Sequence, residues 1–339
     1  MITDLEARLN PRIALAPDGP VLFLERLTRH ERELAGGDRI PAGKPLPGPL
    51  GGLAKEILRR ARRRLHRVPL PRGALVLGRR TLVMGILNVT PDSFSDGGLW
   101  TDPDRAAARG LEMVRQGARI VDVGGESSRP GARRVPEREE LRRVLPVVER
   151  LAKEGVLVSI DTAKAGVARE AFRAGAKILN DITALRGDPA MARTAARAGA
   201  AVILMHMKGT PRTMQKDPRY EDVVADICRF FRKTLNYALS GGIPRDNILL
   251  DPGIGFGKKP EHNVEILRRL DEFRSLGCPL VIGTSRKSFI GHYLNRRADE
   301  RLAGTAATVA AAVLRGADIV RVHDVREMSD VARMADLLR

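Results

Sequence analysis

The sequence predicts an α/β protein: a (β/α)8 TIM barrel that follows an N-terminal, mostly helical extension. Eight short and nearly continuous apolar runs lie between residues 81 and 323, and amphipathic stretches separate them. Such runs are typical of strands buried on both faces of a parallel sheet. Residues 81–339 number 259, which is close to the usual size of this barrel. An open, doubly wound sheet is the less favoured alternative, because it normally uses fewer strands.

The predicted extension occupies residues 1–72 and has three parts. Residues 1–40 carry mixed charge with weak helical periodicity, which is clearest at 21–34. Pro and Gly dominate residues 41–52, so we expect a linker there rather than a helix or a central strand. Residues 53–68 place apolar side chains at steps of three or four opposite a strongly basic face, which predicts an amphipathic helix.

The predicted barrel domain spans residues 73–339. Two short strands around Gly78 and Arg79 predict a β-hairpin before strand one. The eight barrel strands are expected at 81–87, 119–125, 156–162, 176–181, 200–206, 247–253, 279–285 and 317–323. Amphipathic stretches such as 104–118, 165–176 and 262–273 predict the connecting helices, and the last helix is expected at 324–338.

The net charge of +18, from 59 Lys and Arg against 41 Asp and Glu, first suggests an anionic partner such as nucleic acid. Residues 51–80 hold 10 basic and one acidic residue, so they carry half of that excess. Aromatic residues are 4% of the chain, which is sparse for stacking on bases. These observations argue against nucleic acid as a partner, and a solvated helix docked on the barrel is the favoured interpretation of residues 53–68. A helix that binds RNA or a partner remains the alternative.

Cysteine usage and hydropathy exclude further classes of protein. Cys228 and Cys278 are 50 residues apart, which excludes a disulfide scaffold and predicts a cytoplasmic setting. The first ten residues have no apolar segment typical of a signal peptide. No apolar run approaches the ~18 residues of a membrane helix. We therefore expect no membrane association.

Polar residues stand at or just after the end of every predicted strand. They are Asn88, Asp122, Glu126, Asp161, Asn180, Asp181, His206, Asp251, Ser285, Arg286, Lys287, Arg321 and His323. A single polar residue at a strand end often only caps the next helix. All eight strand ends are polar and they include both signs of charge, which predicts an active site at the carboxyl-terminal mouth of the barrel.

The residue types at these strand ends narrow the chemistry. Asp161, Asn180 and Asp251 offer carboxylates and an amide, which suit a flat heterocycle with amino and ring N–H groups. Asn88, Arg321, His323 and Arg129 form a second set, which suits a phosphate or pyrophosphate assisted by a cation.

A glycine-rich stretch and three of the strand-end residues also have interpretations that do not involve catalysis. The glycine-rich stretch 250–259 is neither a Walker loop nor a GxGxxG motif, and we expect a tight loop over a ligand with Phe256 as a wall. His206 is expected to pack or cap a helix, and Asp122 and Asp181 are as suited to orienting neighbouring groups as to touching substrate. The sequence has no HExxH motif and no nucleophile elbow.

Residues 74–339 resemble the dihydropteroate synthase family in an ordered, colinear set of strings. The strings are MGILNVTPDSFSDGG (84–98), GGESSRPGA (124–132), SIDT (159–162), LND (179–181), MHM (205–207), LDPGIGFGK (250–258), GTSRKSFIG (283–291) and RVHDV (321–325). The first and last are especially specific. One departure is Ser128, where the family more often has Thr, but the hydroxyl is kept. Residues 1–73 lie outside the resemblance.

The resemblance implies a transferase of folate biosynthesis that is a target of sulfonamides. The family joins 6-hydroxymethyl-7,8-dihydropterin pyrophosphate to p-aminobenzoate, and releases pyrophosphate. The implied catalytic residues are Lys287, Arg321, His323, Asp96 and Arg129. The implied substrate-binding residues are Asp161, Asn180, Asp251, Phe256, Lys287, Ser288, Arg321, Ser128, Arg129, Pro130, Phe94 and Met205. The resemblance also implies Mg2+ at Asn88 and a homodimer formed through the barrel helices.

The chemistry implied by the resemblance agrees with the two sets of polar residues. An aryl amine is neutral at pH 7, so we expect no strong general base and a dissociative, SN1-like substitution. Pterin-binding methyltransferases share the barrel and are the alternative enzyme class, although they lack the loop at 88–98 in this form. A pterin-binding protein with an added RNA-binding or partner-binding segment is a further alternative.

Overall fold

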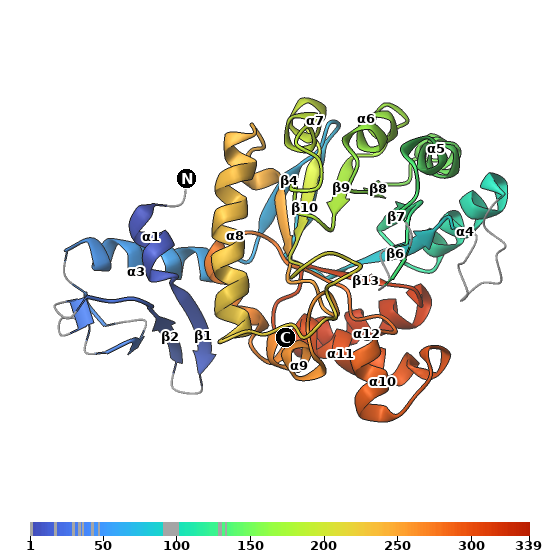
Figure 1. The fold of residues 1–339 in the computed structure, drawn as a ribbon. Coiled ribbons are helices and arrows are strands. Elements are labelled where there is room, and N and C mark those ends of the chain that lie inside the picture. Colours follow the sequence, from blue (N-terminus) through green and yellow to red (C-terminus); the bar gives the residue numbers. More distant parts are fainter. Residues whose placement is uncertain are drawn as a thin grey trace.

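A barrel of parallel strands, with a smaller N-terminal unit against one side, forms the fold (Figure 1). The computed structural model describes residues 3–16, 19–28, 31–32, 35, 37–41, 44–46, 48–90, 102–127, 131–132 and 134–339. Helix α8 (Val223–Ser240) lies between the N-terminal unit and the barrel strands (Figure 1).

The barrel strands occur where the sequence predicts them. They are β6 (Leu82–Asn88), β7 (Ile120–Gly124), β8 (Val158–Asp161), β9 (Ile178–Asp181), β10 (Ala201–Met205), β11 (Ile248–Asp251), β12 (Val281–Ile282) and β13 (Ile319–Val322). Their order is β11-β10-β9-β8-β7-β6-β13-β12, and the paired strands are parallel. A parallel bridge between Leu250 and Leu280 joins the two ends of this sheet. The predicted (β/α)8 barrel is confirmed.

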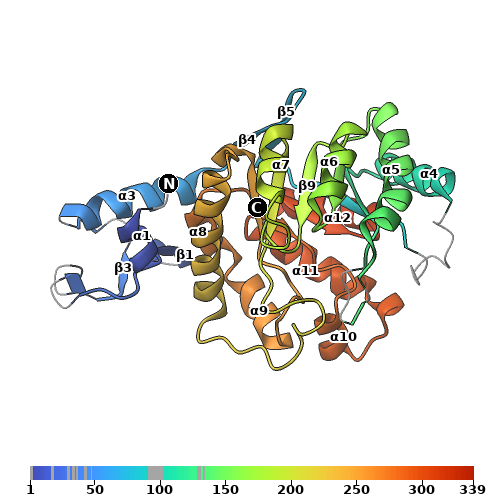
Figure 2. The ribbon, with the colours of Figure 1, turned by 45° about the horizontal axis from the view of Figure 1, so that its top comes forward.

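Helices cover the outside of the barrel (Figure 2). The α-helices are α4 (Pro103–Arg115), α5 (Glu137–Lys153), α6 (Ala165–Arg173), α7 (Met191–Ala198), α8, α9 (Pro260–Arg268), α10 (Ser288–Leu294), α11 (Leu302–Leu314) and α12 (Val325–Leu338). Short 3-10 helices are η2 (Arg245–Asn247), η3 (Leu270–Leu276) and η4 (Ala298–Glu300). The main hydrophobic core lies between strands and helices, where fully buried side chains such as Val123 and Leu151 meet. It fixes the strand ends that carry the polar residues.

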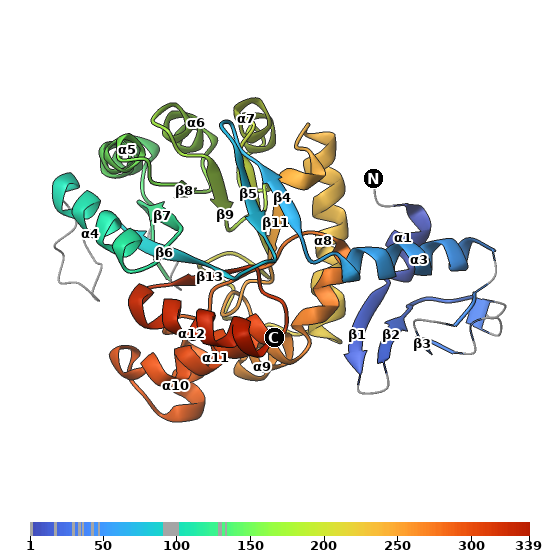
Figure 3. The ribbon, with the colours of Figure 1, turned by 180° about the vertical axis from the view of Figure 1, so that it is seen from behind.

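An antiparallel hairpin closes the amino-terminal end of the barrel. It consists of β4 (His66–Pro69) and β5 (Ala74–Leu77), and Figure 3 shows it from behind. Val68, Leu75 and Leu77 of the hairpin pack in one cluster with residues near the strand starts, including Met84 and Ile319. The hairpin before strand one is confirmed.

The position of the hairpin turn differs from the prediction. The turn lies between Pro69 and Ala74, where Gly73 adopts a φ of 93°. Gly78 also has a positive φ, but a Cβ there would lie 1.6 Å from the Arg64 carbonyl oxygen. Gly78 is thus needed for a close backbone approach. The prediction of a turn around Gly78 and Arg79 is wrong. A glycine occurs both in turns and where two backbone segments lie close together, and the sequence alone does not distinguish the two.

The N-terminal unit contains strands that the sequence analysis does not predict. Its elements are α1 (Asp4–Leu9), β1 (Arg12–Ala16), β2 (Gly19–Phe23), β3 (Arg39–Pro41) and α3 (Gly48–Arg62). The three strands form an antiparallel sheet in the order β1-β2-β3. The helical expectation for 21–34 is therefore wrong at its start, because tertiary packing of Leu22 in the core of this unit outweighs weak helical periodicity.

Helix α3 begins and ends earlier than predicted. Residues 48–52, expected in a linker, form its first turn. Pro49 lies in that turn, where a backbone N–H has no partner within the helix. Gly51 is required because a Cβ there would lie 2.1 Å from the Leu46 carbonyl oxygen. The helix ends at Arg62, and residues 66–69 belong to β4 instead of continuing it.

Buried charged groups attach the N-terminal unit to the barrel. Nη1 of Arg12 lies 2.9 Å from Oε2 of Glu272 in η3. The guanidinium of Arg232 in α8, which is 2% exposed, donates to the Asn10 side chain and the Pro11 carbonyl. Buried charges are stable only when they are paired, so this network fixes where the unit docks. The domain boundary at residues 72 and 73 stays a prediction.

None of the helices in the described part of the chain combines the length and the apolar character needed to cross a bilayer.

We expect the contribution of His66 to the free energy of unfolding to fall as the pH drops from 6.5 to 4. Burial, with the charges of Arg63 and Arg274, lowers the pKa of His66 to about 4. The unfolded chain, whose histidines titrate near 6.5, then binds more protons than the folded protein, so acid favours unfolding. This loss is at most about 3 kcal/mol, at about 1.4 kcal/mol per pKa unit.

Urea unfolding at a series of pH values measures the effect. His66→Gln removes the titrating group, so between pH 6.5 and 4 the free energy of unfolding of this variant should fall by up to about 3 kcal/mol less than that of the wild type. His292→Gln changes an exposed histidine, so its free energy of unfolding should fall as much as that of the wild type. An unchanged slope in His66→Gln would contradict the prediction.

Candidate active site

Arg321 occupies the centre of the polar residues at the mouth of the barrel. It lies on β13, and its Nε donates to Oδ2 of Asp122 on β7 at 2.6 Å. Its Nη2 donates to Oδ2 of Asp161 on β8 at 2.7 Å. Asn180 on β9 donates from Nδ2 to the same Asp122 oxygen at 2.9 Å. Four strands thus contribute to one connected group of side chains, as the convergence of strand ends predicts.

The carboxylates in this group are poorly solvated. Burial raises the pKa of Asp161 to about 7, against the effect of Arg321. Burial also raises the pKa of Asp251, although the Gly253 N–H donates to its Oδ1 at 2.7 Å. Oδ1 of the fully buried Asp122 has no hydrogen-bond partner among the described residues. A ligand with several N–H donors would satisfy these oxygens.

Lys287 and Phe256 form one wall of the site. Nζ of Lys287 lies 4.3 Å from the centroid of the Phe256 ring, a cation–π contact. Phe256 packs with Met205, Met207 and Met214, and the methionines are buried. Gly255 has a φ of 82°, and a Cβ there would lie 3.2 Å from Cδ of Lys287. The glycine-rich loop therefore supports the Lys287 side chain, and Ser288 follows as the first residue of α10.

His323 is a neutral imidazole held by Ser285. Its Nδ1 lies 3.0 Å from Oγ of Ser285, and its backbone N–H donates to the same oxygen at 3.1 Å. Burial and the charge of Arg321 lower the pKa of His323 to about 3. At neutral pH the ring therefore acts through hydrogen bonds rather than through positive charge.

Asn88 lies at the end of β6, near Asp161. A Cβ on Gly124 would lie 3.8 Å from Oδ1 of Asn88 and 3.7 Å from Oδ2 of Asp161. Gly124 therefore leaves space between an amide oxygen and a carboxylate, and such oxygen donors fit Mg2+. The described residues contain no group of three or more His, Cys, Asp or Glu side chains arranged to hold a metal. Substrate oxygens and water would have to complete the coordination, as is common for Mg2+.

Five predicted site residues lie outside the described residues. They are Phe94, Asp96, Ser128, Arg129 and Pro130. Their predicted roles stay predictions.

Two strand-end residues have structural contacts. Nδ1 of His206 lies 3.0 Å from Nζ of Lys258, and its ring packs edge-on against Phe230. Asp181 accepts hydrogen bonds from the backbone N–H groups of Thr183 and Leu185, which orders the turn after β9. The expectation that His206 packs agrees with these contacts, and of the two roles considered for Asp181 they support orienting the backbone.

Sequence reasoning missed the burial of Lys258, and it did not choose between the two roles considered for Asp122. Lys258 is 3% exposed, and burial lowers its pKa to about 7. A lysine in a glycine-rich loop gives no sequence signal of burial. For Asp122 the available signal is its place inside the apolar run RIVDVGG, where an isolated carboxylate must have a partner.

The comparisons with known proteins agree with this geometry. A family model described as "Pterin binding enzyme" matches residues 84–323. A dihydropteroate synthase of Escherichia coli is 49% identical over 242 residues, which is 71% of this chain and 86% of that relative.

The chain belongs to the dihydropteroate synthase family.

Solved structures of the dihydropteroate synthase family share the fold. The Yersinia pestis enzyme in complex with a sulfonamide drug is 45% identical, with a TM-score of 0.77, and the match covers 80% of this chain and 99% of that chain. The Xanthomonas albilineans enzyme with 4-aminobenzoic acid is 44% identical, with a TM-score of 0.72 and coverages of 78% and 95%. Family membership makes the chain a transferase and places its activity in folate biosynthesis. The N-terminal unit precedes the residues that the family model matches.

Proposed function

We propose that the barrel mouth joins 6-hydroxymethyl-7,8-dihydropterin pyrophosphate to p-aminobenzoate, with Arg321 at the centre of the reaction. The observation that carries this proposal is the connected group of Asp122, Asp161, Asn180 and Arg321. In this group, carboxylate and amide oxygens that can accept hydrogen bonds from a heterocycle lie beside the Arg321 guanidinium, which can bind a pyrophosphate.

The pterin is bound by the buried acceptors. The carboxylates of Asp161 and Asp251 accept from its amino and ring N–H groups, while the Asn180 amide offers both a donor and an acceptor. Because these carboxylates are largely buried, each hydrogen bond from the pterin counts for more than it would at the surface. This is the chemistry that selects a flat, N–H-rich ring.

The pyrophosphate is bound by Arg321, His323 and Asn88. With Nδ1 accepting from the Ser285 hydroxyl, the neutral His323 carries its proton on Nε2 and donates it in a hydrogen bond to a phosphate oxygen. Asn88 would hold Mg2+, which would supply positive charge to the departing pyrophosphate. Arg321 supplies a fixed charge of the same sign.

The substitution is dissociative. The C–O bond to pyrophosphate breaks with its electron pair on the leaving oxygen, and the buried Asp161 stabilises the cation that forms on the pterin methylene. The aminobenzoate nitrogen then forms the new C–N bond and releases its proton to solvent. Phe256 and Lys287 provide an aromatic face and a positive charge for the aminobenzoate.

Pyrophosphate release tests the function. The purified chain with both substrates and Mg2+ should release pyrophosphate, and omission of p-aminobenzoate should stop the release. A sulfonamide should raise the KM for p-aminobenzoate without changing kcat, because both compete for one pocket. A folded sample that releases no pyrophosphate under these conditions would refute the proposed reaction.

A homodimer is part of the proposal. Large apolar side chains are exposed on helix α12, where Met334 and Leu337 are 58% and 79% exposed. Exposed apolar groups of this size favour contact with a second copy of the chain.

A further inference from the structure

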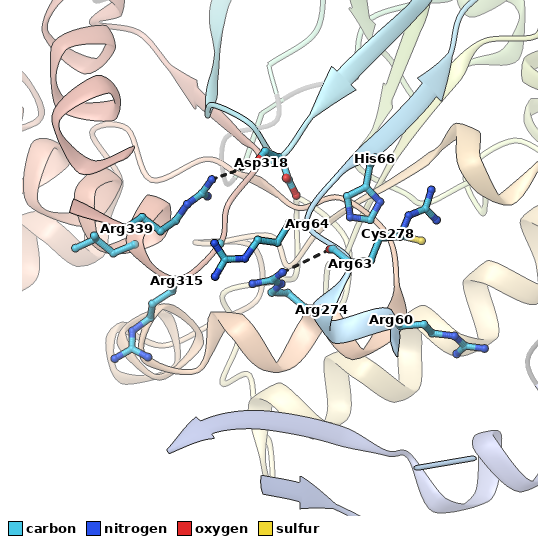
Figure 4. A pocket seen from close by; sticks show the side chains of 12 residues that line it. Arg60, Arg63, Arg64, His66, Arg274, Cys278, Arg315, Asp318 and Arg339 are labelled. Atoms are coloured by element: carbon cyan, nitrogen blue, oxygen red, sulfur yellow. Dashed lines mark hydrogen bonds between the residues drawn. The ribbon is translucent and has the colours of Figure 1, made fainter. Parts of the chain in front are cut away.

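A second polar pocket lies at the end of the barrel opposite the active site. Its volume is about 160 Å³. Six arginines line it, and Figure 4 shows their side chains around the opening; they are Arg60, Arg63, Arg64, Arg274, Arg315 and Arg339. Asp318 is the one acidic side chain among the described residues of the lining. The pocket therefore carries a large excess of positive charge.

Residues at the amino-terminal ends of the strands build this pocket. His66 is the first residue of the closing hairpin, and Gly78 follows its last residue. Cys278 precedes β12, and Asp318 directly precedes β13. The active-site residue Arg321 lies farther along β13, toward its carboxyl end. The two sites are thus at opposite ends of the same barrel.

Close backbone packing holds two of the arginines in place. A Cβ on Gly277 would lie 3.0 Å from Cγ of Arg60. A Cβ on Gly316 would lie 3.2 Å from Cδ of Arg274. Both glycines have positive φ angles, of 73° and 94°. Backbone therefore lies directly against the two aliphatic stems, which limits the positions that the guanidinium groups can adopt.

Acidic residues outside the lining neutralise part of the positive charge in the pocket. Arg60 is paired with Glu6 at 2.7 Å and with Glu56 at 2.8 Å, and Arg339 lies 3.7 Å from Asp336. Arg64 and Arg274 form no ion pair with the described residues. The pairs of Arg63 with Asp246 and of Arg315 with Asp271 have N–O distances of 3.4 and 3.6 Å, which are long for strong ion pairs.

The guanidinium groups also repel one another. Burial and the charges of Arg64 and Arg339 lower the pKa of Arg274, although Asp318 acts in the opposite direction. Like charges held together at a partly buried site cost free energy unless an anion joins them.

We propose that this pocket binds a small phosphorylated anion, with a di- or triphosphate group between the guanidinium groups. Guanidinium groups bind phosphate oxygens in pairs, and several of them match several adjacent phosphates. A cavity of about 150 Å³ holds a ligand of the size of benzene, so this one accommodates a short phosphate chain.

The lining favours a phosphate chain over a stacked base. Apart from the His66 imidazole, the described lining residues include no aromatic side chain. A nucleobase bound inside the pocket would have little to stack on. The inference goes beyond the proposed reaction and does not depend on it, because none of the six arginines lies at the barrel mouth. It also gives a role to Arg63 and Arg64 of the basic segment 51–80.

Isothermal titration with inorganic tripolyphosphate at low salt tests the proposal. The test variant is Arg64→Ser/Arg315→Ser, which removes two exposed charges from the pocket rim. The matched control, Arg62→Ser/Arg67→Ser, removes two exposed charges that do not line the pocket. We expect the Kd to rise at least tenfold in the test variant and less than threefold in the control. Circular dichroism should show both variants folded, and kcat without tripolyphosphate should be unchanged in both.

Three outcomes would overturn the proposal. The first is the absence of any heat of binding with the wild-type chain. The second is an equal loss of affinity for tripolyphosphate in the two variants, which would indicate general attraction of anions to a basic surface. In that case single-stranded RNA should also bind the two variants with equal affinity. The third combines two observations: the pocket substitutions leave tripolyphosphate binding unchanged, and saturating pterin pyrophosphate abolishes it. Together they would place the tripolyphosphate in the active site.

Discussion

Replacing Arg321 by methionine is expected to lower kcat/KM by about a thousandfold or more. Arg321 is bonded to Asp122 and Asp161 at once, and its guanidinium is the positive charge that we assign to the proposed leaving group. Removing one preorganised group that stabilises transition-state charge costs about 100- to 1,000-fold. The loss here is larger, because two carboxylates are left close together without a cation.

The same substitution should destabilise the protein. Breaking a buried ion pair by removing one partner costs about 3–5 kcal/mol, because the remaining charge stays buried. Urea unfolding measures this loss, and steady-state kinetics measures turnover. The double variant Arg321→Met/Asp122→Asn removes one stranded charge, so it should recover much of the stability but none of the activity. If activity returned together with stability, the role of Arg321 would be structural and its assignment to the leaving group wrong.

Replacing Lys287 by alanine should lower kcat by about 100- to 1,000-fold while the protein stays folded. The Lys287 ammonium lies against the Phe256 ring, and its charge also acts on the buried Asp251. Alanine removes that charge from the proposed pterin and aminobenzoate pockets. The side chain is half-buried at the barrel mouth and outside the hydrophobic core, so thermal unfolding should change little.

Lys259→Ala is the matched control for Lys287→Ala. Lys259 is the last residue of the glycine-rich stretch 250–259, and its side chain is 42% exposed and pairs with Asp217 at 3.0 Å. Its removal should leave kcat within about twofold of the wild-type value, since surface ion pairs contribute little. A Lys287→Ala variant with wild-type kcat under the same conditions would remove Lys287 from the catalytic residues.

The barrel was predictable because burial on both faces leaves a clear trace in the sequence. Strands β6 to β13 coincide with apolar runs, and their polar ends follow from the geometry of a parallel barrel. The N-terminal strands were not predictable in this way. Residues 12–16 and 19–23 show no sustained alternation of apolar and polar residues, and their partners are fixed by packing.

The sequence also does not predict which side chains pair with one another at the site. The spacing of motifs puts Asp122, Asp161 and Arg321 at strand ends, but it does not show that one guanidinium joins both carboxylates. That outcome depends on rotamers and on which oxygens remain without water. The arginine pocket was hidden for a similar reason. Arg60 and Arg64 meet Arg274 and Arg315 only after the hairpin has closed the barrel.

The N-terminal unit can dock only late in translation, because its docking partners lie in the later part of the chain. Arg12 pairs with Glu272, which is 260 positions later in the sequence. At about 5–20 residues per second, a ribosome needs on the order of 10 to 50 s to make the intervening segment. During that time the first strand waits without its partner, exposing a charged group and part of an apolar sheet. Chaperones that recognise such surfaces would therefore bind this unit early in translation, before the barrel has been synthesised.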